Sequence, residues 1–146
     1  METKTLNIIK KAFKNKVDKA GSPYINHLIQ VAENTKFFIK NKDVYIIALL
    51  HDLLEDSKDW TEDKLRKIYS NNIVDTLLLL THKKDISYDS YIKNLSKNKY
   101  AVIVKLSDLK HNLDISRFKN FKDVNIERLK KYHKAYNILL KIFNSN

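Results

Sequence analysis

Residues 44–56 read VYIIALLHDLLED and form the most informative stretch of this chain. The apolar run over residues 44–50 is typical of a buried helix, yet His51, Asp52 and the Glu55-Asp56 pair follow it directly. An ionised carboxylate taken out of water costs several kcal/mol unless it is paired or bound to a metal. We therefore expect a cationic group or a metal ion beside this stretch.

The rest of the composition predicts an all-α protein. The chain of 146 residues contains one Gly and one Pro, so the turns that hairpins, sandwiches and Rossmann folds require are missing. The same scarcity excludes a Walker phosphate loop and a G-x-G-x-x-G turn. We expect one compact helical bundle that forms a single domain over residues 1–146.

The chain has no cysteine, no apolar segment after Met1 that resembles a signal peptide, and no run of about 20 apolar residues that could span a bilayer. These features predict a soluble, cytoplasmic protein with no membrane partner.

Lys and Arg number 28 against 17 Asp and Glu, and this excess favours anionic partners, although many of the lysines fit a solvated surface. A non-catalytic nucleic-acid-binding protein is the lesser alternative, because no nucleic-acid motif accompanies the charge.

Apolar residues recur at helical spacing along most of the chain. We expect Ser22 to cap a helix that has Pro23 at its first position. The predicted helices cover residues 3–17, 24–40, 44–55, 61–69, 73–82, 88–95, 101–114 and 126–143.

Polar residues interrupt three of these apolar helices. His27 lies among Ile and Leu residues, and Asp108 follows the apolar segment 102–106. A lone histidine in such a place is more often a hydrogen-bonded core residue than a ligand. Together with His51 and Asp52, however, these residues form a set of two imidazoles and two carboxylates, which suits a divalent transition metal with open positions for water and substrate.

The same residues carry a resemblance to a known family. His27, the doublet His51-Asp52 and the distant Asp108 resemble the ordered H…HD…D pattern of the HD phosphohydrolase superfamily. The strings GSPYINH, ALLHDLLED and VKLSDLKHN, at residues 21–27, 48–56 and 104–112, narrow the resemblance to hydrolase domains of the RelA/SpoT type, including the single-domain metazoan form. It covers roughly residues 5–118. It implies a manganese-dependent hydrolase that removes the 3′-pyrophosphate from the alarmones ppGpp and pppGpp, leaving GDP or GTP.

The resemblance also implies roles for individual residues. The implied metal ligands are His27, His51, Asp52 and Asp108. Glu55 and Asp56 match the acidic pair that orients and deprotonates the attacking water, and Lys19 and Asn112 match substrate-binding positions. His111 adjoins Asn112, and we expect it to point away from the face of Asp108 and to play a structural or supporting part.

Two positions depart from the family pattern. Asp18 stands where these hydrolases usually carry an arginine that packs on guanine, and Asp114 stands where the long enzymes often carry another arginine. Each exchange removes a planar cation and adds a negative charge. The alternative function is therefore an HD phosphohydrolase of another nucleotide, such as a nucleoside monophosphate or the 2′-phosphate of NADPH.

Overall fold

The computed structural model describes residues 1–145. All the regular secondary-structure elements in this range are helices, and loops connect them. One isolated β-bridge joins Val17 to Pro23. The elements are α1 (Glu2–Ala12), α2 (Tyr24–Thr35), α3 (Lys42–Leu50), α4 (Leu53–Asp56), α5 (Glu62–Arg66), α6 (Asn71–Leu80), α7 (Tyr88–Leu95), α8 (Lys99–Asn112), the 3-10 helices η1 (Ile115–Arg117) and η2 (Phe121–Asp123), and α9 (Ile126–Asn144). The predicted all-α fold class is confirmed.

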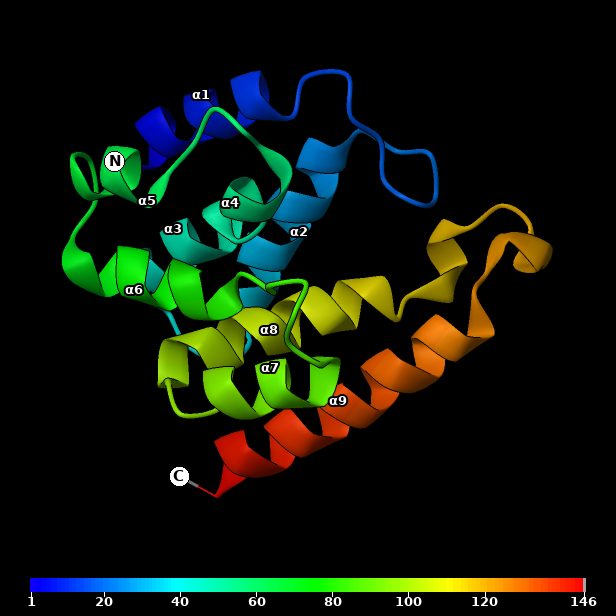
Figure 1. Cartoon of the computed structure of the whole chain (residues 1–146). Helices are drawn as coiled ribbons and strands as arrows, with labels where there is room; N and C mark the ends of the chain where they lie inside the picture. Colours follow the sequence, from blue (N-terminus) through cyan, green and yellow to red (C-terminus); the bar gives the residue numbers. More distant parts are fainter. Residues whose placement is uncertain (146) are drawn as a thin grey trace.

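The centre of the bundle is formed by α3 and α8. Helix α3 packs against α1, α2, α6 and α8, while α8 also contacts α2, α6 and α9. Because neighbours surround these two helices, their side chains are buried on nearly all sides, over residues 46–50 in α3 and 101–104 in α8. Figure 1 shows α9 running along one side of α7 and α8, with the segment of η1 and η2 leading into it.

Polar side chains mark the starts of the helices. The side chain of the N-cap residue accepts a backbone N–H at six helices: Asn41, Thr61, Ser70, Ser87, Asn98 and Asn125. Each such bond satisfies a donor that the first helical turn leaves free. Capping side chains thus define where helices begin in a chain with one Gly and one Pro.

The first two predicted helices are five residues shorter at their C-terminal ends in the structure than expected. The first ends at Ala12 and not at residue 17, because Asn15 adopts a left-handed conformation with φ of 68° and Val17 enters the β-bridge. The second ends at Thr35 and not at residue 40. The predicted capping by Ser22 is also wrong, since Pro23 takes the N-cap position and no side chain caps this helix.

The predicted continuous helix over residues 44–55 is broken at His51 and Asp52. Helix α3 ends at Leu50, Asp52 has φ of −101° and ψ of 0°, and α4 begins at Leu53. In an unbroken helix, successive side chains would point about 100° apart. The break instead allows the side chains of His51 and Asp52 to face the same point in the bundle.

Candidate active site

Three side chains from separate elements meet inside the bundle. His27 of α2, His51 at the α3–α4 break and Asp108 of α8 are all buried, and each offers one ligand atom within 4.8 Å of the others. Asp52 lies beside them, with its Oδ2 atom 3.2 Å from His51 Nε2 and 3.9 Å from His27 Nε2. The structure thus brings together the four residues that the sequence singled out.

The imidazole of His51 is held in one orientation. Its Nδ1 atom is 2.6 Å from the carbonyl oxygen of Ala48, which can only accept, so Nδ1 carries the proton. The other nitrogen, Nε2, is buried and has no hydrogen-bond partner among residues 1–145. A buried polar atom without a partner is costly. Nε2 faces the carboxylates of Asp52 and Asp108, an arrangement that fits a cation at this point, either a proton on Nε2 or a bound metal ion.

The pKa shifts of the clustered residues also indicate a site that favours a cation. Burial disfavours the imidazolium of His51, but the carboxylates of Asp52 and Asp108 outweigh it and raise the pKa of His51 well above its usual value. Burial also disfavours both carboxylates, yet the attraction of His51 lowers the pKa of Asp52 to about 2. Lys105 and His51 hold the pKa of Asp108 well below its usual range, again against burial. Two carboxylates therefore stay ionised in a buried place that favours positive charge.

The carboxylate of Asp108 is held by two side chains of its own helix, α8. Its Oδ2 atom lies 2.9 Å from Nζ of Lys105, and its Oδ1 atom accepts a hydrogen bond of 3.0 Å from Nδ2 of Asn112. Residues three and four apart share a helix face, so α8 itself supplies both supports. Asn112, which the resemblance assigns to substrate, thus also orients a carboxylate of the cluster. Sequence reasoning missed Lys105, although its place three residues before Asp108 was a readable signal.

The two acidic residues of α4, Glu55 and Asp56, bind different partners. Glu55 opens onto the cavity and accepts a hydrogen bond from the backbone N–H of His82. Partial desolvation, together with the nearby charge of Asp52, raises the pKa of Glu55. Asp56 instead forms an ion pair with Lys16, with 2.7 Å between Oδ2 and Nζ. Glu55 forms no ion pair with any residue that the structure describes, so it is better placed than Asp56 to accept a proton.

Tyr24 is a further site residue that sequence reasoning missed. Its hydroxyl donates a hydrogen bond to the carboxylate of Asp52. Burial, with the charge of Asp52, raises the pKa of Tyr24, so the hydroxyl keeps its proton. The ammonium of Lys16 lies 4.2 Å from the centroid of the Tyr24 ring. Tyr24 therefore links Asp52 to the loop that precedes α2.

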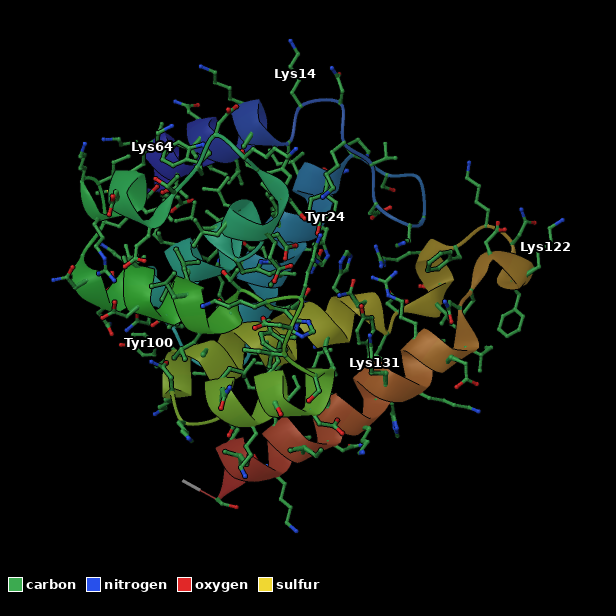
Figure 2. All side chains as sticks on the ribbon, viewed as in Figure 1. Lys14, Tyr24, Lys64, Tyr100, Lys122 and Lys131 are labelled. Atoms are coloured by element: carbon green, nitrogen blue, oxygen red, sulfur yellow. The ribbon has the colours of Figure 1, made fainter. Side chains whose placement is uncertain are left out.

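The cluster opens into a cavity of about 790 Å³. This volume is in the range of small-molecule sites. Figure 2 labels Tyr24 on α2 and Lys131 on α9, two of the residues that line it from different elements. The basic side chains along its walls are Lys16, Lys19, Lys105, Arg117, Arg128 and Lys131. A cavity with ionised carboxylates at one place and many cations around it suits an anionic ligand that reaches the cluster.

The two departures from the family pattern have partners within the fold. Asp18 is paired with Arg117, whose NH1 atom is 2.9 Å from Asp18 Oδ2. The carboxylate of Asp114 caps η1 by accepting from the N–H and hydroxyl of Ser116. The negative charge of Asp18 is thus offset by a guanidinium that lines the same cavity. The expected repulsion of an anionic ligand by Asp18 is correspondingly reduced.

The helical architecture and the cluster of two histidines and two aspartates define the class, an HD-domain fold. A comparison with models of known protein families finds no match. The solved structure described as "A metazoan ortholog of SpoT hydrolyzes ppGpp and plays a role in starvation responses" superposes with a TM-score of 0.77 at 22% identity, covering 97% of this chain and 84% of that one. This likeness shows that the two proteins share a fold.

Sequence similarity points to the same type of protein. The chain is 29% identical over 103 residues to guanosine-3′,5′-bis(diphosphate) 3′-pyrophosphohydrolase MESH1 of Drosophila melanogaster, covering 66% of this chain and 57% of that protein. It is 23% identical over 117 residues to guanosine-3′,5′-bis(diphosphate) 3′-pyrophosphohydrolase of Haemophilus influenzae, covering 73% of this chain and 17% of that protein. The chain thus spans less than two thirds of the length of both curated relatives. The predicted resemblance to hydrolases of the RelA/SpoT type is confirmed.

Among the described residues, no helix is both long enough and apolar enough to cross a membrane.

Proposed function

We propose that this protein is a metal-dependent nucleotide phosphohydrolase that removes the 3′-pyrophosphate of ppGpp and pppGpp. The single observation that carries the proposal is the buried His51 Nε2 atom. It has no hydrogen-bond partner in the described part of the chain, and it faces two carboxylates at the edge of a basic cavity. We further propose that residues 1–146 act as one domain, and that the reaction takes place in the cytoplasm.

The metal ligands in this proposal are the Nε2 atoms of His27 and His51 and the carboxylates of Asp52 and Asp108. Mixed nitrogen and oxygen donors suit a divalent transition metal, and manganese is the ion we propose. When bound, such an ion lowers the pKa of a coordinated water and withdraws charge from phosphoryl oxygens. The fit rests on the donor set and on the fixed orientation of His51, whose Nδ1 proton is bonded to Ala48.

The remaining residues position and deprotonate the reactants. Glu55 accepts the proton of the attacking water, while Asp56, held by Lys16, orients that water. The water oxygen forms a bond to phosphorus, and the bond between this phosphorus and the 3′-oxygen breaks. The 3′-oxygen then takes up a proton, so the products are pyrophosphate and GDP or GTP. Lys19 and Asn112 contact the phosphates and ribose of the substrate.

A panel of nucleotides tests this proposal. The purified protein is loaded with manganese and incubated with ppGpp, a nucleoside monophosphate and NADPH, and pyrophosphate and orthophosphate are measured separately. We expect rapid release of pyrophosphate from ppGpp and its loss on chelation. Orthophosphate from another nucleotide would support the alternative substrate and overturn the alarmone assignment, and no metal-dependent release from any nucleotide would overturn the proposed function.

Lys19 provides a test of substrate binding. Lys19→Ala is expected to raise KM about tenfold with little change in kcat, because a lost phosphate contact costs roughly 1.4 kcal/mol in the ground state and the transition state alike. Lys14→Ala is the matched control, since Lys14 is exposed and points outward in Figure 2. Equal KM values for the two variants would contradict the role of Lys19.

A further inference from the structure

His27 is held from both sides by helix α8. Its Nε2 atom faces Asp108, with 3.1 Å to Oδ1, while its Nδ1 atom lies 2.7 Å from Nδ1 of His111. The two imidazole rings are stacked, with their centroids 4.9 Å apart and 28° between their planes. The prediction that His111 points away from the face of Asp108 is therefore wrong. Residues three apart lie on neighbouring positions of a helix face, so one α8 surface reaches both nitrogens of His27.

The short contact between the two Nδ1 atoms requires that one of them carries a proton. Two ring nitrogens at 2.7 Å form a hydrogen bond only when one of them donates and the other accepts. If His27 Nδ1 is the donor, its Nε2 keeps a lone pair, and that lone pair faces the carboxylates of Asp108 and Asp52. If His111 is the donor, the proton of His27 stands on Nε2 and blocks it as a ligand.

His51 shows the same arrangement with a different acceptor. There the Ala48 carbonyl binds the Nδ1 proton and leaves Nε2 free within the cluster. Metal-binding histidines are usually held in this way by an acceptor at the other ring nitrogen. By the same arrangement, a metal ion bound at His27 Nε2 would require His111 to be the acceptor.

We propose that His111 is a positioning residue whose Nδ1 lone pair accepts the Nδ1 proton of His27 and so presents His27 Nε2 to the metal. This proposal rests on the metal-dependent function proposed above. It assigns His111 no contact with substrate. Two neighbouring residues of α8 then have different roles: Asn112 orients the Asp108 carboxylate, and His111 orients the His27 ring.

Two variants of His111 separate acceptance of the proton from ring packing. His111→Phe keeps a stacked ring but has no acceptor, whereas His111→Asn loses the ring and places an amide oxygen near the position of Nδ1. We expect His111→Phe to weaken Mn²⁺ binding about 10- to 100-fold, the usual effect of losing such an outer partner, and His111→Asn to stay within about threefold of the unaltered chain. Binding is measured by titration calorimetry, with circular dichroism and thermal melting to verify that each variant folds.

Nitrogen-15 NMR of the histidine rings in the metal-free protein gives an independent readout. We expect a coupling across the hydrogen bond between the Nδ1 atoms of His27 and His111, with the proton assigned to His27. A proton assigned to His111 would overturn the proposal, whatever the affinity of the variants. So would equal Mn²⁺ affinity of His111→Phe and the unaltered chain, or equal losses in both variants.

The failure of this proposal can be told apart from failure of the proposed function. If the unaltered chain binds Mn²⁺ and hydrolyses a nucleotide while His111→Phe keeps both properties, only the role of His111 is overturned. If the unaltered chain binds no divalent metal, the proposed function and the role of His111 fall together.

Discussion

Asp52→Asn is expected to abolish divalent-metal binding and to lower kcat/KM about 10³-fold or more. The amide keeps the size of the side chain but removes a charge that lies 3.2 Å from His51 Nε2. A metal supplies several kcal/mol of transition-state stabilisation, and each 1.36 kcal/mol is a factor of ten in rate. Metal content after dialysis and steady-state kinetics with added Mn²⁺ check this expectation.

The control for this variant is Asp85→Asn, in the exposed loop between α6 and α7. It removes the same charge from the surface and should leave metal content and rate unchanged. If Asp52→Asn bound metal as tightly as the control, Asp52 would not be a ligand. The site would then consist of His27, His51 and Asp108 alone.

Glu55→Gln is expected to lower kcat by 10²- to 10⁴-fold while metal affinity stays close to that of the unaltered chain. Glu55 opens onto the cavity, and its carboxylate accepts a hydrogen bond from the His82 N–H. Its pKa is raised by partial desolvation and by Asp52, which makes it a stronger base than an ordinary glutamate. The glutamine cannot accept the proton of water, so the loss should appear in kcat.

Asp56→Asn is the comparison for Glu55→Gln, because the Asp56 carboxylate is engaged by Lys16. We expect a smaller decrease in kcat from Asp56→Asn than from Glu55→Gln. Calorimetric titration with Mn²⁺ and single-turnover kinetics distinguish metal binding from chemistry. Equal loss of metal by Glu55→Gln and Asp52→Asn would contradict the division of roles between these residues.

The fold class was readable from composition because helix formation depends on local spacing and on the absence of turn residues. The same reading failed at the C-terminal ends of the first three predicted helices. Asn15 reverses the chain where periodicity continued the first helix, and the break at His51 interrupts a stretch whose apolar pattern runs on to Leu54. Periodicity reports which residues are apolar, and it contains no information on where backbone hydrogen bonds stop.

The candidate ligands were identified because a carboxylate or imidazole within an apolar helix is anomalous even in one dimension. Their partners were not identified, except that His111 was expected to play a structural or supporting part. Tyr24, Lys105 and His111 matter through contacts with Asp52, Asp108 and His27, and Tyr24 and His111 make those contacts across separations of 28 and 84 residues. Such contacts depend on how α2, α3 and α8 are packed, and no local pattern encodes that packing.

Composition and spacing were enough to predict a helical chain whose apolar helices contain polar groups that resemble an HD-type site. Three contacts became visible only in the folded chain: Lys16 pairs with Asp56 and not with Glu55, Arg117 offsets Asp18, and His111 faces His27. The apolar pattern and its spacing are properties of one segment, whereas charge pairing and proton placement depend on atoms that different segments bring together.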